Sequence, residues 1–258
     1  MQRHKNILPL MLVLAVTALS TLAATAMVAL RGQNQPPASR HQQQKVQTDY
    51  SDWPIADYDA PEPDDPKKRE KRQKKNGRHK SGIAVAPNPG DGLGGNLFND
   101  WEVGLPSLPV NLSDAVIVSE ITNAEAYLSA DKLSLFSEFT VRITEVLKSG
   151  DRSAFEQGAT ITVEREGGRV KYPTGKILYY LIAGQRMPRV GARYLLFLKH
   201  EGEEHSIITG YELQAGRVRA LDELQKFKAL EKFDEANFLQ EVRNAIKSSL
   251  NPPSQERI

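Results

Sequence analysis

The sequence predicts a mainly β domain over residues 109–250, a small antiparallel barrel or sandwich with a C-terminal helix. Two patterns lead to this prediction. From about residue 115, short segments of alternating apolar and polar residues follow one another, separated by turns rich in glycine, proline and polar residues. This is the pattern of strands that bury one face. Near the C-terminus the period changes to that of a helix with one apolar stripe.

The strand expected over 135–148 is the central element. Phe139, Val141 and Ile143 alternate with polar residues, so they should face the core. The residues between and beside them should face outward, namely Glu138, Thr140 and Arg142. A second strand, rich in β-branched residues, is expected over 115–128. Because only the short polar segment 129–132 connects the two strands, they should form an antiparallel hairpin.

Further strands are expected over 159–166, 169–172, 176–182, 194–198 and 207–213. Gly167-Gly168 has the form of a two-residue hairpin turn, so the next strand should return along the preceding one. The run over 194–198 is apolar at every position, which predicts a central strand buried on both faces.

The expected C-terminal helix begins after Asp234, a suitable N-cap residue, and ends before Asn251-Pro252-Pro253. Its apolar stripe consists of Phe238, Leu239, Val242, Ile246 and Leu250. We expect this stripe to cover an open side of the β domain. Residues 251–258 are expected to form a disordered tail.

The opening strand pair, AVIVSEITNAEAYLSADKLSLFSEFTVRITEVLKSGD, resembles OB-like barrels of the netrin/tissue-inhibitor type found in exported bacterial proteins. The segment PRVGARYLLFL over 188–198 is similar to a later strand of those barrels, and the resemblance extends from residue 113 to about 213. It implies an OB-like fold and says less about function. Animal inhibitors of this broad group engage a protease's metal through an N-terminal cysteine. This chain has no cysteine, so that mechanism is not expected.

The first 31 residues predict export. Three basic residues at positions 3–5 precede an uncharged, largely apolar run over 7–30. As a helix this run would span roughly 36 Å, enough to cross a hydrocarbon core of roughly 30 Å. The same residues also fit a signal peptide cleaved near the small residues 24–26. The length favours a retained anchor at the cell membrane with the bulk of the chain extracytoplasmic; cleavage would give a secreted protein.

Residues 32–108 are expected to form a disordered linker, because they combine low hydrophobicity with blocks of like charge. Within it, residues 67–80 carry nine Lys and Arg and one acid, Glu70. This basic run is interpreted either as a solvated spacer or as a polyanion-binding segment. The segment 90–95 matches G-x-G-x-x-G, but no strand precedes it and no helix follows, so a glycine-rich linker is expected there.

Several chemistries are excluded or unsupported. The absence of cysteine excludes disulfides, thiol nucleophiles and cysteine-bound zinc. Residues 112–250 contain 19 Lys+Arg and 20 Asp+Glu, which argues against an obligate nucleic-acid binder. Residues 200–205, HEGEEH, are interpreted as a hairpin tip, with a weak divalent-cation site as the alternative. No hydrolase elbow or phosphate loop occurs, and we expect neither an enzyme nor a cofactor.

Two functions remain. The first is a non-catalytic binding module at the cell envelope, whose partner is an unknown envelope protein or surface polymer and which contacts the membrane through residues 7–30. The second is OB-like binding of polyanions or nucleic acid through a basic face. That face would comprise Arg169, Lys171, Lys176, Arg186, Arg189 and Arg193, with Tyr172, Tyr179 and Tyr180 for stacking. Exposed cations with tyrosines in the core would be the structural alternative.

Overall fold

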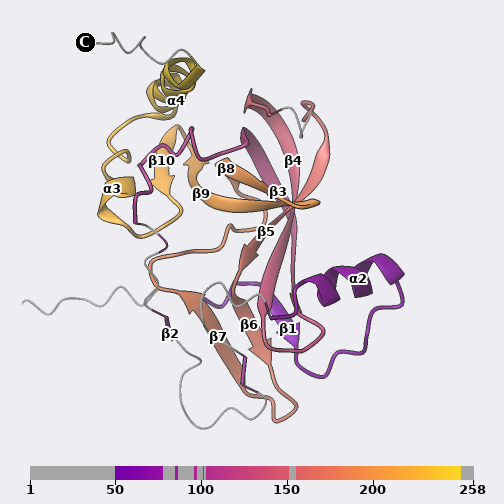
Figure 1. Cartoon of the computed structure of the whole chain (residues 1–258). Helices are drawn as coiled ribbons and strands as arrows, with labels where there is room; N and C mark the ends of the chain where they lie inside the picture. Colours follow the sequence, from indigo (N-terminus) through magenta and orange to yellow (C-terminus); the bar gives the residue numbers. More distant parts are fainter. Residues whose placement is uncertain are drawn as a thin grey trace, which may run out of the picture. The chain divides into compact units, whose positions relative to one another are not determined.

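Strands dominate the computed structural model, which describes residues 50–77, 85–86, 96–97, 101, 103–150 and 155–250 (Figure 1). The expected export segment 1–31, the tail 251–258 and the glycine-rich segment 90–95 lie outside the described residues. The elements are β1 (Ile55–Asp57), α2 (Pro66–Lys74), β2 (Asn96–Leu97), β3 (Ala115–Leu128), β4 (Leu135–Lys148), β5 (Thr160–Glu166), β6 (Gly168–Lys171), β7 (Ile177–Ile182), β8 (Arg193–Glu201), β9 (Glu204–Gln214), β10 (Arg217–Ala220), α3 (Gln225–Lys228) and α4 (Glu235–Leu250).

Five strands of the larger sheet pair in a closed cycle. β3, β4 and β5 form an antiparallel meander, and β8 lies antiparallel to β3. β9 then pairs antiparallel with β8 and parallel with β5, through Glu164 and Ser206. The cycle is therefore β3-β4-β5-β9-β8, and β10 is added to β9. The expected β3–β4 hairpin is confirmed.

The inner face of the cycle carries the predicted core. Phe139, Val141 and Ile143 on β4 are at most 1% exposed, whereas Arg142 between them is exposed. Tyr194 to Leu198 on β8 are buried at every position, as expected for a strand covered on both faces. One face of β8 packs into the core inside the cycle and the other into a second cluster beneath α4.

The Gly167-Gly168 turn was expected to fold the chain back along β5, and this expectation is wrong. β6 pairs with β7 and β1, in a separate sheet of order β1-β6-β7-β2. Both glycines have positive φ, +104° and +140°, conformations that residues with a side chain rarely adopt. A Cβ on Gly167 would lie 2.7 Å from the Tyr180 carbonyl oxygen, and one on Gly168 would lie 2.8 Å from Ser137 Oγ. The two glycines thus let the chain pass from β5 in the cycle to β6 in the smaller sheet at a point where there is no room for a side chain.

The C-terminal helix α4 is part of the fold, as expected (Figure 1). Phe238, Val242 and Ile246 are buried in the second apolar cluster, together with Tyr211 and Phe227. The N-cap is also confirmed in its geometry: the Asn237 N–H donates to Asp234 Oδ1 at 2.9 Å, which satisfies a helix-terminal donor.

Residues 50–77, which we call the strap, are ordered, so the linker expected over 32–108 is corrected for this segment. Trp53 is 4% exposed within the core of the cycle. β1 pairs in parallel with β6, and α2 lies beside the β3–β4 hairpin, where the Ala130 N–H donates to the Arg72 carbonyl at 3.2 Å (Figure 1). Asp65 caps α2 by accepting from the Lys67 N–H, and Pro66 occupies its first turn. No helix in the described ranges is long and apolar enough to span a bilayer.

Candidate functional site

Three glutamates on neighbouring strands form a strongly charged site. Glu138 lies on β4, Glu164 on β5 and Glu204 at the start of β9. We call these three residues the glutamate face. Glu138 and Glu164 are direct cross-strand partners, an arrangement in which like charges destabilise a sheet. Positively charged partners are therefore needed to offset the repulsion between these carboxylates.

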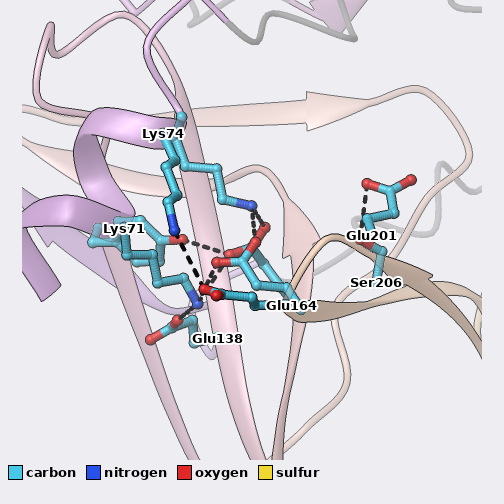
Figure 2. A network of polar contacts seen from close by, with 10 residues as sticks. Lys71, Lys74, Glu138, Glu164, Glu201 and Ser206 are labelled. Atoms are coloured by element: carbon cyan, nitrogen blue, oxygen red, sulfur yellow. Dashed lines mark hydrogen bonds and ion pairs between the residues drawn. The ribbon is translucent and has the colours of Figure 1, made fainter. Parts of the chain in front are cut away.

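Helix α2 and its C-cap residue, Lys75, supply those cations. Lys71 and Lys75 are four residues apart, so they project from the same side of the helix. The Lys71 ammonium pairs with Glu138, lies 3.0 Å from Glu204 Oε1 and 3.5 Å from Glu164 Oε2. The Lys75 ammonium pairs with both Glu164 and Glu204. Figure 2 shows Lys71 reaching from the helix toward Glu138 and Glu164 on the strands.

The centre of this network is withdrawn from water. Lys75 is 5% exposed and Glu164 is 4% exposed. The Tyr127 hydroxyl donates to Glu164 Oε2 at 2.5 Å, and the Lys75 ammonium lies 4.6 Å from the Phe136 ring centroid. Charged partners, a hydroxyl donor and an aromatic face together compensate for the loss of hydration.

The pKa shifts follow from this packing. Burial alone would lower the pKa of Lys71, but its hydrogen bond to Glu138 and the charges of Glu138 and Glu164 raise the pKa above its ordinary value. Burial would likewise raise the pKa of Glu204, but hydrogen bonds from Lys75 and Lys71 lower it. Burial raises the pKa of Tyr127, and the negative charge of Glu164 raises it further. Each group is thus held in the charge state that the network needs.

The strap has two further attachments to the domain. At its N-terminal end Trp53 inserts into the core, and its carbonyl accepts from Arg169 Nε at 2.7 Å. At its C-terminal end the Gly77 N–H donates to Asp131 Oδ2, and the Asp131 N–H donates to Asn76 Oδ1, both at 2.9 Å. The β3–β4 turn therefore holds the end of α2.

The structure brings together only part of the basic face expected between residues 169 and 193. Arg169 and Lys171 lie at alternate positions of β6, and Lys176 lies in the turn before β7. The three remaining arginines are engaged in ion pairs: Arg186 with Glu223, Arg189 with Glu212 and Arg193 with Glu235. Carboxylates from later parts of the chain therefore neutralise half of the expected set.

The tyrosines expected to stack on bases are largely internal. Tyr172 and Tyr180 are 2% and 5% exposed, and their hydroxyls lie 2.6 Å apart in a hydrogen bond. Tyr179 is half-buried, with its ring centroid 5.7 Å from that of Tyr50. Of the two interpretations of these tyrosines, the one that places them in the core is confirmed for Tyr172 and Tyr180, which belong to the core of the smaller sheet, and stacking on bases is wrong for these two residues.

The two histidines of the 200–205 segment face each other across the β8–β9 hairpin. His200 and His205 are cross-strand partners with ring centroids 5.0 Å apart. Burial lowers the pKa of His205, and the neighbouring His200 lowers it further, against an opposing effect of Asp114. Within the described ranges, no group of three or more His, Asp or Glu side chains is placed to hold a metal ion.

A second buried ion pair is structural. Arg165 donates to Asp222 Oδ2 at 2.8 Å, and both side chains are at most 2% exposed. Thr209 and the Arg186 N–H also donate to the Asp222 carboxylate. The Asp222 carboxylate thus joins β5, β9 and the loop that contains Arg186. Its role is to hold these parts of the fold together.

The sequence contained weak signals for the strap. Trp53 is a large apolar residue within a polar segment, and Asp65-Pro66 has the form of a helix start.

Comparison with known proteins gives no relative of this chain. The sequence matches no family model, and none of the curated proteins matches it.

Proposed function

We propose that the chain folds as an OB-like barrel with a C-terminal helix. The proposal is supported by the cycle β3-β4-β5-β9-β8, in which β5 and β9 form the single parallel pair. OB folds bind ligands on the face of their second and third strands, flanked by the loops after the first and fourth strands. The corresponding parts here are β4, β5, the 129–134 turn and the 202–203 turn. The glutamate face lies on these elements.

The function that this geometry supports best is a non-catalytic binding module whose ligand is a lysine-rich helical segment. One observation carries the proposal: three glutamates from three strands hold Lys71 and Lys75 of a segment distant in sequence. The spacing of the glutamates matches two ammonium groups one helical turn apart. We place this module at the cell envelope, because residues 7–30 have the composition of an export segment or anchor.

The alternative, polyanion binding on an OB-like face, has less support. The face that OB folds use for such ligands is acidic in this chain, and it would repel phosphate groups. Outside that face, three of the six expected cations already pair with carboxylates. Arg169 and Lys171 remain as a small cationic surface on β6.

Peptide binding tests the proposed function. The full chain carrying Lys71→Ala and Lys75→Ala should expose the glutamate face and bind a labelled peptide of residues 62–77, measured by fluorescence anisotropy. Wild-type protein should bind the peptide at least about tenfold more weakly, a ratio equivalent to roughly 1.4 kcal/mol, because its own helix competes. Binding should weaken as salt is added.

Two controls define the site. A peptide in which Lys71 and Lys75 are replaced by alanine should not bind. Adding Glu164→Gln and Glu204→Gln to the protein should abolish binding of the unmodified peptide. Equal binding of both peptides would show that recognition does not use the lysine pair and would refute the proposal.

A further inference from the structure

We infer that the strap is an exchangeable ligand, and that the glutamate face of one chain accepts the strap of a second copy of this chain. The inference rests on the proposed function, since it names the partner of that same face.

The strap contacts the domain in the ways that peptides contact protein receptors. β1 adds a short strand beside β6, with Ile55 opposite Arg169 and Asp57 opposite Lys171, which is recognition by strand addition. Trp53 acts as a buried aromatic anchor. α2 has no buried apolar residue, so its docking depends on the lysine–glutamate contacts.

The connection after the strap permits docking in trans. Residues 78–84, which lie outside the described ranges, join Gly77 to Val85. The Val85 N–H donates to the Leu133 carbonyl at 2.8 Å, so the chain rejoins its own domain at the β3–β4 turn. Eight Cα–Cα steps span at most roughly 29 Å. An exchanged pair must therefore place the two β3–β4 turns within that distance of each other.

Every copy of the chain brings one strap and one glutamate face, so a reciprocal pair leaves no lysine or glutamate of the network without its partner. The contacts in the pair are those seen within one chain. Exchange of an identical segment is a low-cost route to a dimer for this reason. A symmetric pair also satisfies the buried Glu164, which an empty face would leave with Tyr127 alone.

Complementary variants of the full chain test the exchange. An acceptor carries Trp53→Ala, Lys71→Ala and Lys75→Ala, so its strap is disabled and its face intact. A donor carries Glu138→Gln, Glu164→Gln and Glu204→Gln, so its face is disabled and its strap intact. Mixed in equal amounts, they should form a 1:1 complex in analytical ultracentrifugation, and neither should dimerise alone. Circular dichroism and cooperative unfolding of each variant check that it folds.

A second experiment keeps the network intact. Because the chain lacks cysteine, Arg72→Cys and Ala130→Cys can be placed on two separate chains, at positions whose backbones are hydrogen bonded. A short bismaleimide should cross-link the two chains after they are mixed and concentrated. A single chain with both cysteines should cross-link internally and serves as the control for geometry. No product should form when only one type of cysteine chain is present.

The outcomes separate the two proposals. If the acceptor binds the 62–77 peptide but not the donor, and the single-cysteine chains give no dimer, the second copy is not the partner, while the proposed function stands. If the acceptor binds neither peptide nor donor, although it is folded, both proposals fail. Heterodimer formation and intermolecular cross-linking together support the exchange.

Discussion

Replacement of Lys75 by methionine probes the buried network most directly. The substitution keeps an unbranched side chain, shorter by one heavy atom, and removes the charge that holds Glu164 and Glu204. Breaking a buried ion pair costs about 3–5 kcal/mol, because the remaining charge is left desolvated. We expect about 3 kcal/mol, the lower end of that range, since Lys71 remains 3.5 Å from Glu164 and the Tyr127 hydroxyl still donates to it.

Lys74 is a matched control on the adjacent position of the same helix. It pairs with Glu70 at 3.1 Å and Glu203 at 3.3 Å, but all three side chains are well exposed, so solvent and salt screen these pairs. Lys74→Met changes the charge and the side chain in the same way as Lys75→Met. Its unfolding midpoint should therefore stay close to that of the wild type.

Urea unfolding followed by tryptophan fluorescence measures both variants, because Trp53 belongs to the strap and lies in the core. With a slope of about 2–3 kcal/mol per molar urea, a loss of about 3 kcal/mol lowers the midpoint by roughly 1–1.5 M. The reasoning is refuted if Lys75→Met and Lys74→Met lower the midpoint by the same amount. That result would mean that the lysine–glutamate contacts do not exclude water.

Four further expectations concern other parts of the fold. Val141→Ala should lower the free energy of unfolding by about 1–3 kcal/mol and Thr140→Ala by far less, since only Val141 is fully buried. Equal effects of the two substitutions in urea unfolding would contradict the assignment of Val141 to the core face of β4 and Thr140 to the opposite face. Deleting residues 234–258 should lower the melting temperature strongly or abolish soluble expression, because it uncovers the second apolar cluster; an unchanged melting temperature would place α4 outside the core. The pKa of Glu204 is lowered on folding, so the contribution of this carboxylate to stability is complete at pH values above its ordinary pKa of 4.5 and is lost as the pH falls through the lowered pKa. A Glu204→Gln chain should therefore lose less stability than the wild type between pH 5 and pH 3, measured by urea unfolding. Trypsin should cleave after Lys75 slowly at low salt because the side chain is buried, and rapid cleavage there would argue for an undocked strap.

The strands of the cycle could be predicted because their signal is local. On β4, alternate residues face the core and the solvent, and this alternation follows from strand geometry alone. The apolar run 194–198 and the stripe of α4 are equally local patterns. The run is buried as expected, and so are Phe238, Val242 and Ile246 of the stripe, whereas Leu250 at the end of the helix is exposed, contrary to the prediction.

The strap could not be predicted in this way, because its stabilisation comes from distant residues. Nine cations within residues 67–80 would repel one another in an isolated segment. Glu138, Glu164 and Glu204 remove that repulsion for Lys71 and Lys75, but each glutamate lies 67 or more residues along the chain from the lysine with which it pairs.

The same reason explains the errors at the turn and at the basic face. Gly167-Gly168 has the local form of a hairpin, and only the positions of Tyr180 and Ser137 show that the chain passes through a crowded junction instead. Between residues 169 and 193 no acid occurs in the sequence. The acids that pair with the arginines come from later elements.

The position of the strap at the beginning of the folded region has a consequence for the order of synthesis. Lys71 leaves the ribosome 133 residues before Glu204, counted from the sequence. At roughly 5–20 residues per second, this interval is roughly 7–27 s. Throughout it the lysine-rich segment has no complete glutamate face to bind, and β1 has no β6 until residue 168 has been added. The strap is therefore synthesised before every strand that holds it in place.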